Sequence, residues 1–264
     1  MRHGACRRNH GVQPILIITT LLLAALTHCR ADDTPQRWDR AICLQSTEKT
    51  DKESKNHLAT GFFVQQDDRL FLVTAHHAAV QTNKNTRLLY ADQQGQPQWV
   101  ALRVLCPGNR PPWRHHQNSD LATAEVTLTD QSQPYVASFS EMAIPHTVIS
   151  DEDPPRTTDI EVAGFPLGLG LQHRVSPIVV KGHIASRAIA SENEWGSEPL
   201  LYSFPDLAQG TSGGPVFLSS SDPTSVTLVG MFVGVIFDKS GGKLSKLVPG
   251  RLIKAAVDQH AAGS

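Results

Sequence analysis

Three short segments carry side chains that can together hydrolyse an acyl bond. Ser212 lies in the segment 210–214, where three glycines surround one serine on a turn that only small residues can build. A serine hydroxyl is a poor nucleophile unless an imidazole takes its proton and a carboxylate orients that imidazole. His77 follows an apolar run and Asp120 precedes another, so both groups are available in the order base, acid, nucleophile.

Other interpretations of these segments are a plain β-turn, a nucleophile elbow and a metal site. Residues 210–214 also fit the G-x-S-x-G elbow of α/β-hydrolases, which requires a helix, an acid and a histidine after the serine. Here residues 215–218 continue as a strand, and His260 is the only later histidine. Adjacent histidines on a strand point to opposite faces, so His76 and His77 are a poor pair of metal ligands. We therefore expect a serine nucleophile and neither metal nor cofactor.

The three segments resemble the motifs of chymotrypsin-fold (trypsin-like) serine proteases, most closely the bacterial HtrA-type protease domain. Residues 74–77, Thr-Ala-His-His, resemble T-A-A-H, which makes His77 the base. Residues 120–122 resemble D-[IL]-A, and residues 210–215 resemble G-[DN]-S-G-G-P. With weaker matches at 163–168 and 182–186, the resemblance covers roughly residues 57–237.

This resemblance implies an all-β fold of two six-stranded antiparallel β-barrels and a serine endopeptidase acting on polypeptides. Ser212 attacks the scissile carbonyl, His77 carries the proton, and Asp120 fixes the imidazole tautomer. The backbone N–H groups of Gly210 and Ser212 form the oxyanion hole. The alternative is a catalytically inactive protease-like binding module, because His76 and Thr211 depart from the family pattern and displacements of about 1 Å cripple positioning.

Further departures limit what the resemblance implies. No I-V-G-G sequence follows a basic cleavage site, and Thr211 stands where zymogen-activated members carry Asp, so activation by a new amino terminus is not expected. The stretch after Phe237 is too short for a PDZ domain, so we expect a stand-alone protease domain.

The substrate pocket and the cysteines give weaker expectations. Asp206 precedes Ser212 by the offset at which trypsin-type members carry the acid that attracts Arg or Lys, but it is equally a solvated turn residue. The opposite wall is expected from Val233, Gly234 and Val235, whose apolar character is compatible with small aliphatic substrate side chains. A disulfide between Cys43 and Cys106 is possible, although sequence alone does not show that two sulfurs meet.

The first 31 residues predict a secretory signal peptide. Arg2, Arg7 and Arg8 precede an apolar run at 14–26, which is shorter than the roughly 20 residues of a membrane-spanning helix, and cleavage is expected after Ala31. The product is then secreted or periplasmic, without stable membrane insertion. Removing four arginines and no acid from 24 basic and 25 acidic residues leaves a net negative charge, which gives no nucleic-acid footprint. The sequence gives no indication of oligomeric state.

The elements that must position these side chains are short strands. The chain has 264 residues, 40% hydrophobic and 19% charged, which is ordinary globular composition. We expect the first barrel at 32–135, an inter-barrel crossing at 136–158, the second barrel at 159–247, and a C-terminal helix and tail at 248–264. Runs rich in β-branched and aromatic residues predict strands at 58–64, 70–74, 86–90, 99–105, 121–128, 159–165, 173–189, 200–204, 215–218 and 226–237.

Overall fold

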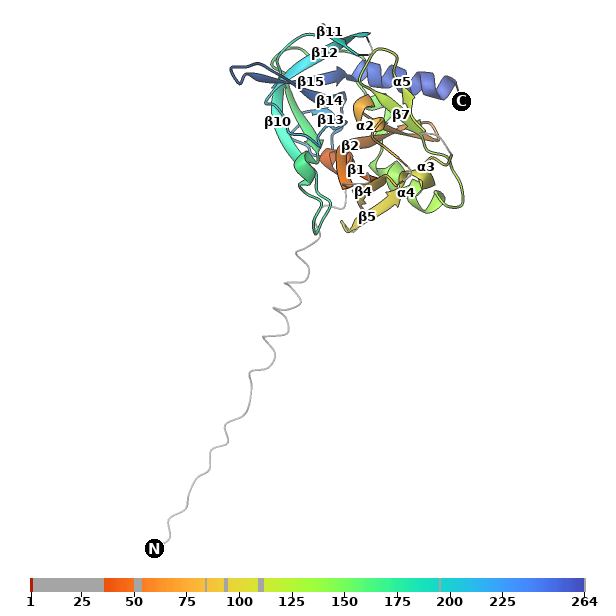
Figure 1. Ribbon diagram of the computed structural model, residues 1–264. Helices are drawn as coiled ribbons and strands as arrows, with labels where there is room; N and C mark the ends of the chain where they lie inside the picture. The colour runs from red at the N-terminus through yellow and green to blue at the C-terminus, as the bar shows by residue number, and fades with distance from the viewer. Residues whose placement is uncertain are drawn as a thin grey trace. The chain divides into compact units, whose positions relative to one another are not determined.

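Two mainly antiparallel β-sheets make up the body of the protein, as a computed structural model shows (Figure 1). The structure describes residue 1 and residues 36–49, 54–83, 85–92, 95–108, 112–194 and 196–263. The expected signal peptide, apart from Met1, and its cleavage site after Ala31 lie outside the described residues.

The first sheet holds the predicted base and acid. Its strands follow the order β5-β4-β1-β2-β3-β7-β6, and the short β8 pairs with β2. Six strands form the main path, and β6 and β8 are two-residue additions. The strands are β1 (Ala41–Lys49), β2 (Ser54–Gln66), β3 (Arg69–Thr74), β4 (Arg87–Ala91), β5 (Pro97–Ala101), β6 (Arg114–His115), β7 (Ala122–Glu125) and β8 (Ile144–Pro145).

The second sheet closes on itself. Its order is β10-β9-β13-β14-β15-β12-β11, and β10 also pairs with β12, which closes a ring of six strands with β11 as an extension. The strands are β9 (Asp159–Gly164), β10 (Ile178–Ile184), β11 (Ile189–Asn193), β12 (Gly196–Phe204), β13 (Pro215–Leu218), β14 (Leu228–Phe237) and β15 (Lys243–Pro249). The prediction of a two-barrel, mostly β fold is therefore confirmed.

Helices are more numerous than the sequence pattern predicted. Four α-helices and three short 3-10 helices lie among the described residues: η1 (Arg37–Arg40), α2 (His76–Ala79), α3 (Leu102–Leu105), α4 (Gln133–Met142), η2 (His146–Val148), η3 (Pro166–Gly168) and α5 (Gly250–Ala262).

Helix α4 begins just before the predicted inter-barrel crossing at 136–158, outside every strand and helix that the sequence predicted. Its buried residues include Phe139, whose ring lies 4.5 Å from that of Phe63 and 4.7 Å from that of Tyr90. Tertiary packing of two or three apolar side chains stabilises this helix, and that signal is too weak to stand out in a polar stretch.

Helix α5 is the C-terminal helix that the sequence predicted. Ile253, Ala256 and Val257 are buried, at the expected helical spacing. The helix follows β15 of the second sheet and packs on β14, but it also contacts β7 of the first sheet, where Thr123 Oγ1 and His260 Nδ1 are 2.8 Å apart. It therefore ties the two sheets together (Figure 1).

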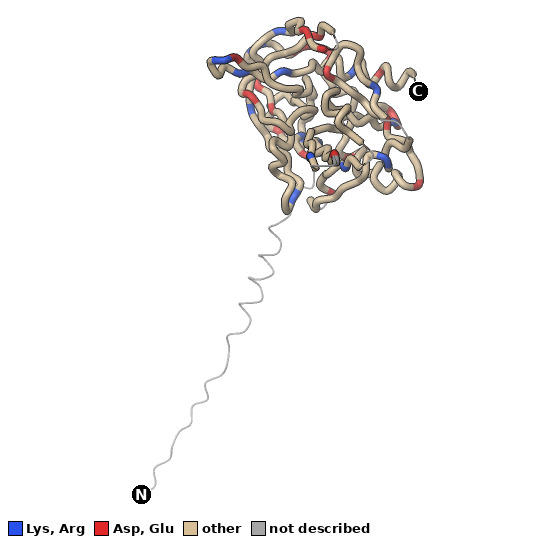
Figure 2. The backbone as a smooth tube through the Cα atoms, viewed as in Figure 1, with Lys and Arg blue, Asp and Glu red and all other residues tan. Residues whose placement is uncertain are grey.

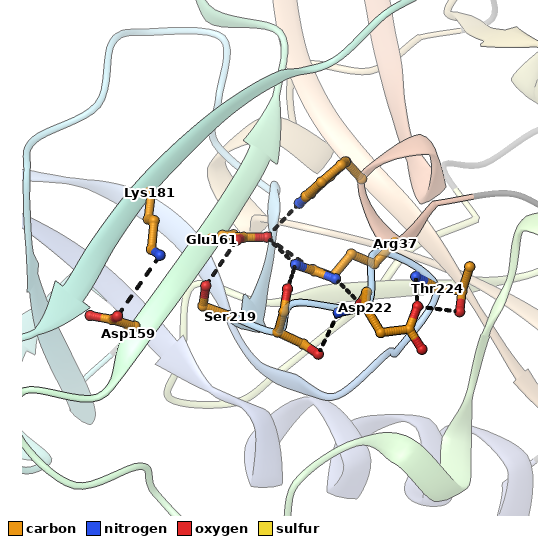
Figure 3. A network of polar contacts seen from close by, with 9 residues as sticks. Arg37, Asp159, Glu161, Lys181, Ser219, Asp222 and Thr224 are labelled. Atoms are coloured by element: carbon orange, nitrogen blue, oxygen red, sulfur yellow. Dashed lines mark hydrogen bonds and ion pairs between the residues drawn. The ribbon is translucent and has the colours of Figure 1, made fainter. Parts of the chain in front are cut away.

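Arg37 fastens the beginning of the described body to the second sheet (Figure 3). The guanidinium is 1% exposed, and its Nη2 lies 2.7 Å from Glu161 Oε2. It also donates to the backbone carbonyls of Asp222, at 2.6 Å, and Ser220, at 2.8 Å. Each nitrogen of this buried cation thereby has an acceptor, since Nε also donates to Glu161 Oε2 at 2.9 Å, as a buried charge requires.

Glu161, on β9, is the buried partner in this network. Burial alone would raise the pKa of its carboxyl, but hydrogen bonds from Trp38, Arg37 and Ser219 and the charge of Arg37 together hold that pKa below its ordinary value. The carboxylate therefore stabilises the fold at neutral pH.

Charged residues of both signs are interspersed along the described chain (Figure 2). Within the ranges that the structure describes, no helix is both long and apolar enough to cross a bilayer.

Candidate active site

His77 and Asp120 meet at the edge of the first sheet. Strand β3 ends at Thr74, and His77 lies in the short helix α2 that follows, not on a strand end as the apolar run predicted. The two atoms His77 Nδ1 and Asp120 Oδ2 are 2.7 Å apart, and the backbone N–H of His77 donates to Asp120 Oδ1 at 2.9 Å. A carboxylate bound twice to one residue fixes both the ring and its backbone. An ionised Asp120 therefore favours the tautomer with the proton on Nδ1, which leaves Nε2 to act as a base.

A second buried carboxylate supports Asp120 from the other sheet. The backbone N–H of Asp120 donates to Glu198 Oε2 at 3.0 Å, and Asn193 Nδ2 donates to Glu198 Oε1 at 2.7 Å. Glu198 is 3% exposed and lies on β12. Sequence reasoning missed it, because nothing in its polar surroundings at the start of a strand distinguishes it from a solvated glutamate.

The loop that carries Ser212 is attached to the first sheet through Thr60 of β2. The backbone N–H of Thr60 donates to the carbonyl of Ser212 at 2.8 Å, and its hydroxyl donates to the carbonyl of Gly210 at 2.8 Å. Thr74 Oγ1 in turn donates to the carbonyl of Thr60 at 2.7 Å. Ser212 is thus linked through Thr60, and then Thr74, to β3, the strand that leads into His77.

Two glycines of this loop are required by their surroundings. Gly213 has φ +87° and lies against the Thr60 carbonyl and the Thr74 hydroxyl, with which a Cβ would overlap. Gly210 has φ +96°, and a Cβ there would lie 2.5 Å from the carbonyl oxygen of Phe165. Positive φ and close backbone approach both demand glycine, which explains the glycines around Ser212.

The backbone around Ser212 presents two N–H groups suited to an oxyanion. Neither the Gly210 N–H nor the Ser212 N–H donates to an acceptor within the described part of the chain, whereas Gly213 N–H donates to Phe232 O and Gly214 N–H to Thr211 O. Donors held open beside a nucleophile are what a developing oxyanion requires.

The structure brings the three predicted triad residues into one region without a direct bond between all of them. His77 and Asp120 are hydrogen-bonded, whereas no hydrogen bond joins Ser212 to His77 among the described residues. In ligand-free enzymes such bonds are often long. The joint catalytic role of the three residues stays a prediction.

His76, next to His77, packs against a third histidine. Its ring stacks on that of His115 of β6, with the ring centroids 3.9 Å apart. Burial, and then the neighbouring His115, lower the pKa of His76, and burial lowers that of His115. Among the residues that the structure describes, no group of three or more His, Cys, Asp or Glu side chains is arranged to hold a metal ion.

Three of the predicted specificity residues, Val233, Gly234 and Val235, lie in β14, and the fourth, Asp206, follows β12. Val233 is buried in β14, directly after Phe232, which bonds to the Ser212 loop through Gly213. Asp206 is exposed, and its Oδ2 lies 3.5 Å from Lys243 Nζ. Lys243 therefore partly offsets the negative charge of Asp206.

The possible disulfide is not formed. Cys43 and Cys106 are both free and buried. Cys43 faces Thr60 and Leu89 across β1, whereas the Cys106 thiol, after α3, donates to the carbonyl of Glu125 at 3.3 Å. Burial raises the pKa of each thiol to about 12, so both are inert at neutral pH.

Comparison with known proteins identifies the family of the chain. Residues 59–231 match the family model of the trypsin-like peptidase domain. No curated protein matches the sequence.

Solved structures share the fold at low sequence identity. The MamO protease domain from Magnetospirillum magneticum aligns with a TM-score of 0.55 and 14% identity, over 83% of this chain and 96% of that one. The Rv3671c protease from M. tuberculosis, in its active form, aligns with a TM-score of 0.51 and 16% identity, over 95% of this chain and 94% of that one. The HtrA-type protease AlgW with a decapeptide aligns with a TM-score of 0.54 and 16% identity, over 86% of this chain and 67% of that one. The alignment with an AlgW structure that holds a tripeptide covers 61% of the AlgW chain. At these identities the alignments establish the fold alone.

Proposed function

This chain belongs to the family of trypsin-like peptidase domains and is a serine protease of that family, and we propose that it is an active, secreted or periplasmic endopeptidase. The observation that carries the proposal is the pair of hydrogen bonds between His77 and Asp120, together with the two Thr60 hydrogen bonds that attach the Ser212 loop to the same sheet.

The proposed chemistry is acyl transfer through Ser212. His77 Nε2 takes the proton of the Ser212 hydroxyl as its oxygen attacks the scissile carbonyl, and the Asp120 carboxylate stabilises the imidazolium that forms. The Gly210 and Ser212 N–H groups bind the oxyanion, each donor contributing about 2.7–4 kcal/mol to transition-state stabilisation. The imidazolium then protonates the leaving amine, and water hydrolyses the acyl-enzyme by the same steps in reverse.

The proposed substrate is a polypeptide with a small aliphatic residue before the cleaved bond. Val233, Gly234 and Val235 follow Phe232 in β14, and the Phe232 carbonyl accepts from the Gly213 N–H of the Ser212 loop, which places this apolar segment next to that loop. Ion pairing of Asp206 with Lys243 argues against the trypsin-type preference for Arg and Lys.

Active-site labelling tests the proposal. A fluorophosphonate probe should label the wild-type protein and the control Ser221→Ala, whose serine is exposed, and should spare Ser212→Ala. A folded wild-type protein that is not labelled would contradict the proposal and leave an inactive, protease-like binding module. Export is tested separately, by the amino-terminal residue of protein recovered outside the cytoplasm, which we expect to be Asp32.

A further inference from the structure

A hollow lined by two arginines and an exposed tryptophan lies on the first sheet. It has a volume of about 550 Å³, and Arg87, Arg103 and Trp99 line it together with polar side chains from β1. Both arginines are exposed, and Trp99 is 55% exposed. No carboxylate is among its described lining residues, and neither arginine forms an ion pair within the described ranges.

The strand pairing holds these side chains in place before any ligand arrives. Arg87 on β4 lies opposite Ala101, and Leu89 lies opposite Trp99, so Arg87 and Trp99 are diagonal neighbours on one face of the sheet. The guanidinium carbon of Arg87 is 4.4 Å from the centroid of the Trp99 ring. A guanidinium stacked on an aromatic ring keeps its N–H edge available for a planar anion such as a carboxylate.

The hollow is connected to the candidate active site along the same face of the sheet. Asn56 and Leu58 of β2 line a smaller hollow of about 220 Å³ beside Gly210. On β1, Gln45 lies opposite Leu58 and Thr47 opposite Asn56, and the Thr47 hydroxyl donates to Asn56 Oδ1 at 3.0 Å.

Gln45 and Thr47 are also lining residues of the arginine hollow, and Gln45 lies opposite Arg87. The linings of the two hollows therefore adjoin across the pairing of β1 with β2. Side chains from β2, β1, β4 and β5 form one continuous track leading away from Gly210.

The direction of this track relative to the cleaved bond follows from the loop contacts. The Ser212 loop lies between β14, bonded through Phe232, and β2, bonded through Thr60. The wall of the proposed specificity pocket belongs to β14, on the side that receives the residue whose carbonyl is attacked. The β2 side then receives the leaving group, which is the part of the substrate C-terminal to the cleaved bond.

We propose that Arg87 and Arg103, with Trp99, bind acidic side chains of the polypeptide substrate on the C-terminal side of the cleaved bond. This inference rests on the proposed peptidase function. Three strand spacings of about 4.8 Å separate β2 from β5, and an extended chain advances about 3.3 Å per residue. The acidic residues are therefore expected about five to eight positions after the cleaved bond.

Hydrolysis of two matched peptides tests the inference. The peptides share the sequence around the cleaved bond, and one carries Glu and Asp where the other carries Gln and Asn, at the fifth to eighth positions after it. Wild-type protein should cleave the acidic peptide with a kcat/KM at least about tenfold higher, and this preference should fall in about 0.5 M salt. The double variant R87Q/R103Q should lose the preference, and its thermal unfolding should be unchanged.

A matched control removes the same charge elsewhere. Arg156 lies just before β9 and Arg187 between β10 and β11. Both are exposed and have no ion-pair partner among the described residues. The variant R156Q/R187Q should retain the full preference. An equal loss in both double variants would overturn the inference, because general charge and not the hollow would then be responsible.

Binding measured without cleavage separates this inference from the proposed function. A fluorescently labelled acidic peptide should bind Ser212→Ala protein, and R87Q/R103Q in that background should weaken binding about tenfold or more. Hydrolysis of both peptides at equal rates would overturn the inference and leave the peptidase function intact. Arginine-dependent binding without any hydrolysis by wild-type protein would support the arginine hollow as a binding site for acidic peptides and would refute the proposed peptidase function. Tighter binding of a sulfated polysaccharide, with no measurable peptide binding, would overturn the assignment to a polypeptide.

Discussion

Replacing Glu198 should impair the candidate active site although no hydrogen bond joins it to His77 or Ser212 among the described residues. Its carboxylate is the acceptor for the backbone N–H of Asp120 and is almost fully buried. In Glu198→Leu this N–H loses its acceptor in a buried place, and an unsatisfied buried donor costs about 1–3 kcal/mol. Since about 1.36 kcal/mol corresponds to a factor of ten in rate, the full cost corresponds to a loss of about 5- to 160-fold.

The cost divides between activity and stability according to how the molecule relaxes. If the Asp120 segment shifts to find another acceptor, its carboxylate moves relative to His77 and kcat/KM falls. If the segment stays, the free energy of unfolding falls instead. The assay therefore combines kcat/KM on a peptide substrate with denaturant unfolding, and the two losses together should reach at least about 1 kcal/mol.

A spectroscopic measurement distinguishes a positioning role from a general packing defect. Burial lowers the pKa of His116, and the negative charge of Glu198 partly offsets that lowering. Loss of the charge should lower this pKa further in an NMR titration, in both Glu198→Leu and Glu198→Gln. The glutamine variant keeps an acceptor oxygen for the Asp120 N–H, so it should retain most of the activity that the leucine variant loses.

Glu192→Leu, an exposed position on the adjacent β11, is the control and should behave as wild type. The reasoning is refuted if Glu198→Leu keeps both its kcat/KM within about twofold and its unfolding free energy within about 0.5 kcal/mol.

Three further predictions concern the buried polar groups. Arg37→Met leaves Glu161 buried without its guanidinium and should lower the free energy of unfolding by about 3–5 kcal/mol at neutral pH. The pKa of Glu161 is lower in the folded protein than its ordinary value of 4.5, so the stabilisation that the ionised carboxylate gives the fold is fully present above pH 4.5. This stabilisation is lost as the pH falls through the lower folded-state pKa. The unfolding free energies of wild type and variant should therefore converge in that acidic range. The Thr211 hydroxyl is buried without a partner among the described residues, so Thr211→Val should preserve activity and leave thermal stability unchanged or higher; a large loss would show an unrecognised hydrogen bond. Cys43 and Cys106 should resist a thiol reagent in native protein and both react after denaturation; one fast-reacting thiol would contradict their burial.

The parts of the site that sequence reasoning found are those whose chemistry fixes both residue type and local sequence. A serine held by surrounding glycines is visible because positive φ and close backbone contacts at Gly210 and Gly213 allow no other residue. His77 and Asp120 are visible because each adjoins an apolar run that becomes a buried strand. The long apolar β14 and the periodic α5 were predictable for the same reason, since burial leaves a local pattern.

The parts that were missed depend on contacts between distant segments. Glu198 acquires its role from the pairing of β12 with its neighbours and its approach to the first sheet, and no local feature announces this. In the sequence Arg37 cannot be distinguished from a solvated arginine, because its buried partner Glu161 lies on the distant strand β9. Strand β1 was missed because its second half, from Gln45, is polar, and it is ordered by pairing with both β2 and β4.

The most direct test of the central claim is the search for new peptide termini after incubation of a mixed peptide library with the purified protein at about pH 8. Wild-type protein should generate new termini that share a small aliphatic residue before the cleaved bond, and Ser212→Ala should generate none. Cleavage by Ser212→Ala equal to that by wild type, or no cleavage by folded wild-type protein, would contradict the account.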